Sequence, residues 1–180
     1  MAVRRKHIRT LVERLLSNQG IQSSPVEVED LARALGVEVR YEPTDDSLSG
    51  FLLRDIKHHQ AVIGVNSKHP ENRQRFTIAH ELGHFLLHEG ERVHVDRADY
   101  GFQVKLRNNN SGKGTDIEEK EANLFAAELL MPASFVEQDL ANVETLDLLD
   151  DEGLKILADK YKVSTTALTF RLAYLKYIEL

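Results

Sequence analysis

Two histidines within residues 76–88 are spaced so that they could bind the same metal ion. The stretch reads FTIAHELGHFLLH and contains His80, Glu81 and His84. On a helix, residues four apart lie on one face, about 6 Å apart along the axis, so two imidazoles can converge on one small cation. Glu81 projects about 100° away from His80 and can instead reach a water molecule beside the ion, where a general base is needed. The pattern predicts His80 and His84 as metal ligands and Glu81 as the catalytic base of a hydrolase.

The residues around these histidines favour a metal site over a pair of ordinary surface histidines. Apolar residues surround the helix on nearly all sides, which predicts that it is buried. Buried imidazole and carboxylate groups need partners, and a metal ion would supply one. Gly83 costs a helix about 1 kcal/mol relative to Ala, which indicates that something nearby needs the room.

A catalytic zinc site needs a third protein ligand and an open fourth position. His88 continues the same stripe, but it lies about 12 Å from His80 along the axis, so one ion cannot bind both. Gly90 stands where an extended version of the motif would have a third histidine. The third ligand is therefore expected further along the chain. Three side chains in a predicted loop are weak candidates: His94, Asp96 and Asp99.

A second helix, predicted over residues 116–130, offers stronger candidates for the third ligand. Thr115-Asp116-Ile117-Glu118 has the pattern of a capping box, with Thr115 as the N-cap. By the 100° rule Glu119 falls within the apolar arc of this helix, Glu121 beside it and Glu128 opposite. A carboxylate that points into a core needs a partner, although a first-turn Glu can also be exposed and favoured by the helix dipole. We expect Glu119 to be the ligand, with Glu121 as the alternative and Asn123 as a hydrogen-bonding partner at the site.

The elements around these two helices predict a small α+β protein. Apolar stripes predict N-terminal helices over residues 3–17 and 25–35, and the basic residues at the start of the first helix predict a solvated face. Three strands over residues 37–41, 48–54 and 60–66 predict a small, mostly antiparallel sheet packed on the metal-site helix, which should span 70–89. The strand over 60–66 could be an edge that holds the substrate as an added strand. Residues 103–115 predict a mobile surface loop that could act as a lid.

The composition is that of a globular protein with a real core. The chain has 180 residues, of which 42% are hydrophobic and 29% charged. The net charge of −6 argues against broad nucleic-acid binding, although a local basic face stays compatible with it. The chain has no Cys, which excludes disulfide scaffolds, thiolate zinc sites and cysteine nucleophiles. No apolar run approaches 18 residues and the N-terminus lacks a signal-peptide core, so we expect a soluble, cytoplasmic protein.

Two segments together resemble the ImmA/IrrE family of bacterial metallo-endopeptidases. They are residues 75–84 (RFTIAHELGH) and 119–132 (EKEANLFAAELLMP), and the resemblance extends over about residues 8–175. In such proteins the two motif histidines and a Glu of the second segment bind zinc, and the Glu between the histidines is the base. The resemblance therefore implies His80, His84 and Glu119 as zinc ligands and Glu81 as the base. Because a site of two histidines and one glutamate suits several divalent ions, Mn²⁺ and Fe²⁺ are alternatives to Zn²⁺.

The resemblance also implies a substrate and a domain organisation. Members of the family cleave a repressor, typically a helix-turn-helix regulator encoded beside them, and so derepress phage, mobile-element or stress genes. We expect a zincin-like metallopeptidase domain over residues 1–132 and a C-terminal helical segment over 133–180 packed on it. The residues that could stabilise an oxyanion are Tyr100, His94 and Arg97.

The C-terminal segment supports an alternative function. Helical patterns over residues 154–161 and 165–177, with Ser164 as an N-cap between them, resemble a helix-turn-helix DNA reader. The chain could then be a DNA- or repressor-binding regulatory protein that keeps its metal site for structure. The second of these helices, however, offers few groups for phosphate contacts. Those expected to point outward are mainly Thr165, Thr166, Thr169 and Arg171.

Overall fold

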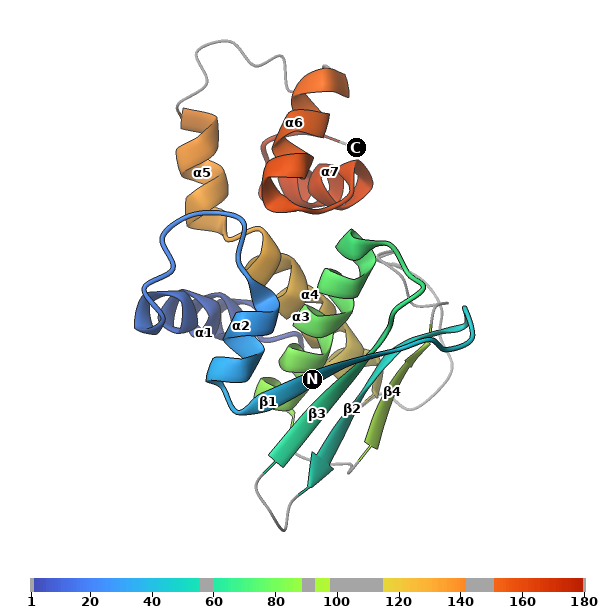
Figure 1. Ribbon diagram of the computed structural model, residues 1–180. Coiled ribbons are helices and arrows are strands. Elements are labelled where there is room, and N and C mark those ends of the chain that lie inside the picture. Colours follow the sequence, from blue (N-terminus) through green and yellow to red (C-terminus); the bar gives the residue numbers. More distant parts are fainter. Residues whose placement is uncertain (1, 56–59, 89–92, 98–114, 142–150, 180) are drawn as a thin grey trace.

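The α+β fold class predicted from the sequence is confirmed by the computed structural model. The structure describes residues 2–55, 60–88, 93–97, 115–141 and 151–179 (Figure 1). The helices are α1 (Arg5–Asn18), α2 (Val28–Ala34), α3 (Glu71–Leu87), α4 (Thr115–Leu130), α5 (Ala133–Ala141), α6 (Asp151–Tyr161) and α7 (Thr165–Tyr174). The strands are β1 (Val37–Glu42), β2 (Leu48–Asp55), β3 (Gln60–Asn66) and β4 (Val93–Arg97).

The described strands form one sheet in the order β1-β3-β2-β4. Strand β2 pairs antiparallel with both β3 and β4, whereas β1 pairs parallel with β3. The three predicted strands are therefore confirmed, although one of the two pairings among them is parallel. Strand β4 adds a fourth strand where a loop was expected, and with it two of the three pairings in the described sheet are antiparallel. The prediction that residues 60–66 form an edge strand is wrong, because β3 lies between β1 and β2. Alternating side chains identify a strand, but they do not encode which strand becomes its neighbour.

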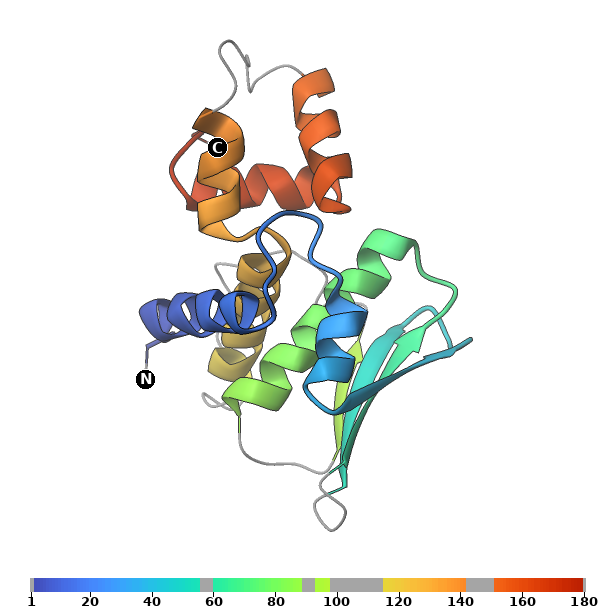
Figure 2. The ribbon, with the colours of Figure 1, turned by 60° about the vertical axis from the view of Figure 1, so that its left-hand side comes forward.

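Helix α3 is buried between the sheet and α4. It packs against β2 and β3 on one side and against α4 on the other, while α2 lies beside it and α1 packs on α4 (Figures 1 and 2). Every residue from Thr77 to His84 is buried. The predicted burial of this helix on nearly all sides is thus confirmed, and its polar side chains must find partners within the protein.

Two arginines hold the C-terminal end of α3 in place. Arg54 of β2 donates to the main-chain oxygens of His84 (2.6 Å) and His88 (3.1 Å), and Arg4 donates to that of Leu87 (3.1 Å). The last carbonyls of a helix have no partners within the helix, and positive charge is favourable at this end of the helix dipole. The turn that carries His84 is therefore fixed from the sheet and from the N-terminal segment.

The C-terminal helices lie at one end of the molecule, beyond α4 (Figure 1). Ser164 caps α7 by accepting a hydrogen bond from the main-chain N–H of Ala167 at 3.1 Å, as the sequence predicted. The prediction that Arg171 points outward is wrong, because this residue is 2% exposed. Its guanidinium lies 2.8 Å from the carboxylate of Glu128 and donates to the main-chain oxygen of Met131. Glu128, expected on the polar side of α4, is accordingly buried as well.

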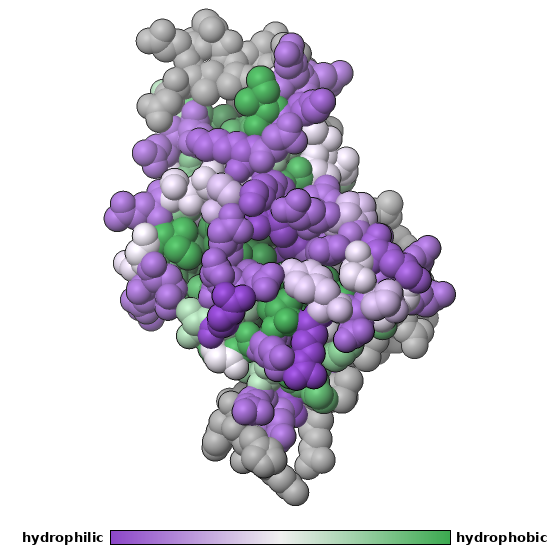
Figure 3. All heavy atoms as spheres, viewed as in Figure 1, coloured by the Kyte–Doolittle hydropathy of each residue, from purple (hydrophilic) through white to green (hydrophobic). Residues whose placement is uncertain are grey.

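The surface in the view of Figure 3 is largely hydrophilic, and hydrophobic residues show in separate groups between polar ones. Within the described ranges, no helix combines the length and the apolar character needed to cross a membrane. The domain boundary expected at residue 132 stays a prediction.

Candidate metal centre

The two motif histidines and Glu119 meet in the structure, although they come from different helices. His80 and His84 are one turn apart on α3, and their Nε2 atoms lie 3.1 Å from each other. Glu119, near the start of α4, reaches them from the opposite side. Its Oε1 atom is 3.2 Å from Nε2 of His84, and its Oε2 atom is 3.5 Å from Nε2 of His80. The three candidate ligand atoms all lie within 4.8 Å of one another.

These separations fit a tetrahedral metal ion. Atoms that each lie about 2.0–2.1 Å from a tetrahedral centre are roughly 3.3 Å apart. The separations range from 3.1 to 3.5 Å, and the two that involve Glu119 use different oxygens of its carboxylate. Nδ1 of His80 lies 3.1 Å from the amide oxygen of Asn123, which can only accept, so this nitrogen carries the proton and Nε2 presents a lone pair. A lone pair aimed at a carboxylate calls for a cation between them, and the residues therefore fit a divalent ion.

The electrostatics of the cluster favour the forms that bind metal. Burial lowers the pKa of His84 to about 4, so its imidazole is neutral at pH 7. Burial alone would raise the pKa of Glu119, but its contacts with His80, His84 and His94 outweigh this effect and hold that pKa well below its ordinary range. The centre thus combines a neutral imidazole with an ionised carboxylate, as a divalent ion requires of its ligands.

Glu81 is fully buried next to this cluster but is not part of it. Its Oε2 atom lies 3.1 Å from Nδ1 of His94. Its Oε1 atom is buried and finds no hydrogen-bond partner among the described residues. One carboxylate oxygen is therefore held in place while the other is free to accept a proton, which suits the general base that the sequence predicts.

His94 bridges the predicted base and the predicted third ligand. Its Nε2 atom lies 2.9 Å from Oε1 of Glu119, and its ring stacks on that of His84 with 3.7 Å between centroids. Burial lowers the pKa of His94, but hydrogen bonds to Glu119 and Glu81 outweigh this and raise that pKa to about 10. At pH 7 the ring is therefore cationic, and both nitrogens donate to carboxylates.

The sequence analysis placed His94 in a loop and gave it little weight. In the structure β4 pairs His94 with Leu52 of β2, a residue with no exposed surface, so both side chains are on the face that α3 covers. The alternation of Val93, His94 and Val95 indicates a strand, but the two Val residues share the face opposite to His94, so this pattern alone would have placed His94 toward solvent.

The other candidates fall outside the cluster. Glu121, the alternative third ligand, instead binds Arg4, and the hydrogen bond from this guanidinium lowers the pKa of Glu121 to about 2. Asn123, predicted as a hydrogen-bonding partner at the site, contacts His80. Asp99, Tyr100 and the predicted lid over residues 103–115 lie outside the described residues, apart from Thr115, which is the first residue of α4. The side chains of Asp96 and Arg97 are not described.

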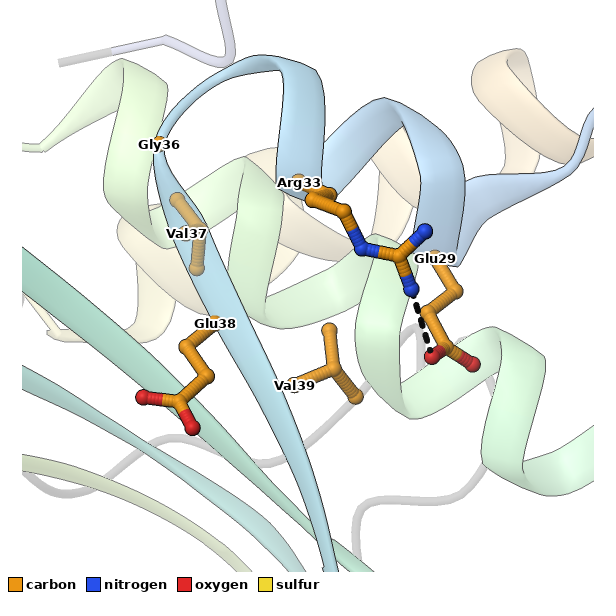
Figure 4. Close-up of a pocket in the computed structure, with 6 residues that line it drawn as sticks. All are labelled: Glu29, Arg33, Gly36, Val37, Glu38 and Val39. Carbon is orange, nitrogen blue, oxygen red and sulfur yellow. Dashed lines mark hydrogen bonds and ion pairs between the residues drawn. The ribbon is translucent and has the colours of Figure 1, made fainter.

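A separate pocket of about 440 Å³ lies at α2 and β1, away from these side chains (Figure 4). The guanidinium of Arg33 points toward the Glu29 carboxylate, 3.3 Å away, and also lies 3.0 Å from Asp30. Because these charges satisfy one another, we assign no chemistry to this pocket. Its lining is made by Glu29, Arg33, Gly36, Val37, Glu38 and Val39.

The fold and the cluster agree with what comparison with known families shows. The sequence model of the IrrE N-terminal-like domain, which defines the Peptidase M78 family, matches residues 32–173. This match covers most of the chain and includes both helices of the cluster. The chain belongs to this family of metallopeptidases, and the resemblance predicted from the two segments is confirmed.

Two individual proteins show how far the similarity extends. The radiation response metalloprotease IrrE of Deinococcus deserti is 33% identical over 119 residues, which cover 66% of this chain. The match covers only 37% of that protein, so the chain spans little more than a third of this relative. A solved structure of a Mycobacterium tuberculosis transcriptional regulator has a TM-score of 0.63 at 16% identity and covers 93% of this chain and 46% of that one. At this identity the second likeness shows the fold alone.

Proposed function

We propose that the chain is a zinc-dependent endopeptidase that cuts a helix-turn-helix transcriptional repressor. The observation that carries the peptidase proposal is the convergence of His80, His84 and Glu119 at separations that suit one tetrahedral ion, beside the buried carboxylate of Glu81. These three side chains would hold Zn²⁺. Mn²⁺ and Fe²⁺ also suit such a donor set.

The described side chains divide the hydrolytic chemistry between them. A bound ion supplies Lewis acidity, which lowers the pKa of water and polarises a peptide carbonyl. Glu81 accepts a proton at Oε1 and later returns it to the leaving amine, while His94 holds Oε2 in place. Because both N–H groups of His94 face carboxylates, this ring could stabilise negative charge on the substrate only through its own positive charge and not by a hydrogen bond.

The sheet offers a place for the substrate beside the cluster. Strand β4 is an edge of the described sheet and carries His94 toward the metal centre. An extended peptide can bind such an edge as an added strand through main-chain hydrogen bonds. We therefore place the substrate along β4 rather than along β3, which is central.

The substrate class comes from the family resemblance. We propose a helix-turn-helix repressor encoded by a gene next to that of this protein, whose loss would derepress phage, mobile-element or stress genes. Such a substrate would place the reaction in the cytoplasm.

The test is to mix the purified protein with the product of the adjacent repressor gene, with zinc and with a chelator. Wild type should cut the repressor only when zinc is present. Glu81→Gln should bind as much zinc but cut at least about 100-fold more slowly, because general base catalysis contributes about 10²–10⁴-fold. Glu118→Gln, an exposed change on α4, should match wild type. Loss of zinc from Glu81→Gln, or normal cutting by it, would contradict the assignment of Glu81 as the base.

A DNA- or repressor-binding regulator that keeps the metal site for structure is the second candidate. The capped turn between α6 and α7 favours it. The burial of Arg171 weighs against it, because the exposed first turn of α7 then presents the uncharged Thr165 and Thr166. A shift of promoter DNA on a gel, with no cut in the repressor by wild type, would favour this function instead.

A further inference from the structure

His88 contacts His84 on the ring nitrogen that does not face the metal centre. The Nδ1 atoms of the two residues lie 3.2 Å apart, and Nε2 of His88 lies 3.2 Å from Oε2 of Glu121. Glu121 is 2% exposed, and Arg4 binds it with its main-chain N–H at 2.8 Å and its guanidinium at 2.6 Å. The segment before α1, the helix α4 and the end of α3 are thus joined by one chain of hydrogen bonds.

The direction of each hydrogen bond in this chain follows from what each group can donate. An ionised carboxylate only accepts, so Nε2 of His88 carries a proton and donates it to Glu121. A neutral imidazole has a single N–H. The Arg4 guanidinium, 2.6 Å from Glu121, already balances the charge of this carboxylate, so a neutral His88 suffices and its single N–H lies on Nε2. Nδ1 of His88 is therefore an acceptor. Nδ1 of His84 must then be the donor, which leaves Nε2 of His84 as a lone pair that faces His80 and Glu119.

We propose that His88, held by Glu121 and Arg4, is a positioning residue that fixes the tautomer and the ring orientation of His84 for metal binding. This inference rests on the proposed metal function of the centre. Histidines that bind metals usually donate their second N–H to a fixed acceptor, and loss of that acceptor typically weakens metal binding about 10–100-fold. Here the acceptor is the imidazole of His88. The buried carboxylate of Glu121 accepts from the other nitrogen of that imidazole and so fixes its orientation.

The inference also gives Glu121 and Arg4 a role that the sequence did not suggest. Glu121 was the alternative ligand, and Arg4 was expected to form part of a solvated basic face. In the structure they meet across 117 positions of sequence. The N-terminal segment is thereby connected to the metal centre through three side chains.

The test compares two substitutions of His88 with a matched control. His88→Phe keeps a ring of similar size but removes the acceptor, whereas His88→Gln keeps an acceptor oxygen within reach of Nδ1 of His84. His7→Phe removes an exposed histidine from α1 and controls for nonspecific zinc binding by histidine. Zinc affinity is measured by competition with a chromophoric chelator, and the Tm of each metal-free protein reports on folding. The tautomer of His84 in the metal-free protein is read from ¹⁵N NMR of its ring nitrogens.

We expect His84 of metal-free wild type to carry its proton on Nδ1. His88→Phe should bind zinc about 10–100-fold more weakly and lose this tautomer preference, while His88→Gln should recover most of the affinity and His7→Phe should match wild type. A proton on Nε2 of His84 in wild type, or full affinity in a folded His88→Phe, would overturn the proposal. If His88→Phe does not fold, a wild-type proton on Nδ1 of His84 together with near-wild-type zinc affinity of His88→Gln supports the proposal. A wild-type proton on Nε2 of His84 overturns it. Wild type that binds no zinc would refute the metal site itself, whereas the tautomer measurement would still test the hydrogen-bond chain.

Discussion

Glu119 brings a carboxylate from a second helix to the motif histidines, and its contacts keep it ionised. It touches His84 at 3.2 Å and His94 at 2.9 Å, and its side chain is 26% exposed. At this exposure the carboxylate can contact solvent when no metal is bound. As the proposed third ligand, Glu119 would hold the ion through its charge and through its placement by α4.

We predict that Glu119→Gln weakens zinc binding by more than the 10–100-fold that loss of an outer hydrogen-bonding partner typically causes. The reason is that an amide oxygen replaces a charged ligand at nearly constant volume. Chelator competition measures the affinity, and Glu118→Gln, one position earlier on the exposed side of α4, is the matched control. Equal zinc affinity in the two variants would show that Glu119 is not a ligand.

At the residue scale, sequence spacing found the side chains on α3 and α4 that converge, but not those that support them. A period of four residues on one helix places His80 and His84 together, and an apolar arc marks Glu119 as inward-facing. Contacts between distant segments leave no such signal. The pairing of Arg4 with Glu121 and the strand that carries His94 depend on how the elements assemble, and no local period reveals that.

The close approach of α3 to α4 is what brings Glu119 within reach of the histidines. Gly83 makes this approach possible, because a Cβ atom at this position would lie 3.0 Å from Cα of Ala122 and 3.2 Å from its main-chain oxygen. Both neighbours are main-chain atoms, which cannot rotate away as the end of a flexible side chain could. The helix-weakening glycine seen in the sequence thus has a packing reason.

We predict that Gly83→Ala destabilises the protein, although Ala is the better helix former by about 1 kcal/mol. Overpacking a core typically costs about 1–3 kcal/mol, which should outweigh this gain and push α4 away from the histidines. Thermal unfolding with and without zinc measures both effects, and the zinc-dependent rise in Tm should shrink. A variant that is more stable than wild type and binds zinc equally well would show that α4 can shift to accommodate the extra methyl group without loss of zinc binding.

At the element scale, the sequence predicted the three strands before α3 and both helices of the site, because each has a clear period and residues that end it. It did not predict the sheet order. The parallel pairing of Val39 with Ile63 across β1 and β3 depends on a crossover that local patterns do not specify. The substrate edge was therefore assigned to β3 from the sequence, whereas our proposal places it along β4.

At the scale of the whole molecule, a buried ion pair links the C-terminal helices to α4. Arg171 of α7 lies 2.8 Å from Glu128 of α4, and Arg9 of α1 approaches the same carboxylate at 3.5 Å. Glu128 and Arg171 are both nearly inaccessible to solvent. Three segments that are distant in sequence therefore meet at one carboxylate, nine residues after Glu119 on the same helix.

We predict that Arg171→Met alone destabilises the chain by about 3–5 kcal/mol, since it leaves a buried carboxylate without its main partner. Adding Glu128→Leu should recover part of this loss, because the double variant buries no unpaired charge. Urea unfolding, followed by a probe in the C-terminal segment and by zinc release, measures both. If residues 133–180 unfold in a separate transition that leaves zinc binding intact, the segment is an independent domain rather than part of the same cooperative unit.

The most direct measurement is anomalous diffraction at the zinc edge from crystals of the zinc-loaded protein. The account predicts one peak between α3 and α4, about 2.0–2.1 Å from Nε2 of His80 and of His84 and about 2.0–2.2 Å from a carboxylate oxygen of Glu119. A peak bound by His88 and Glu121 instead, or no peak beside His80 and His84, would contradict it.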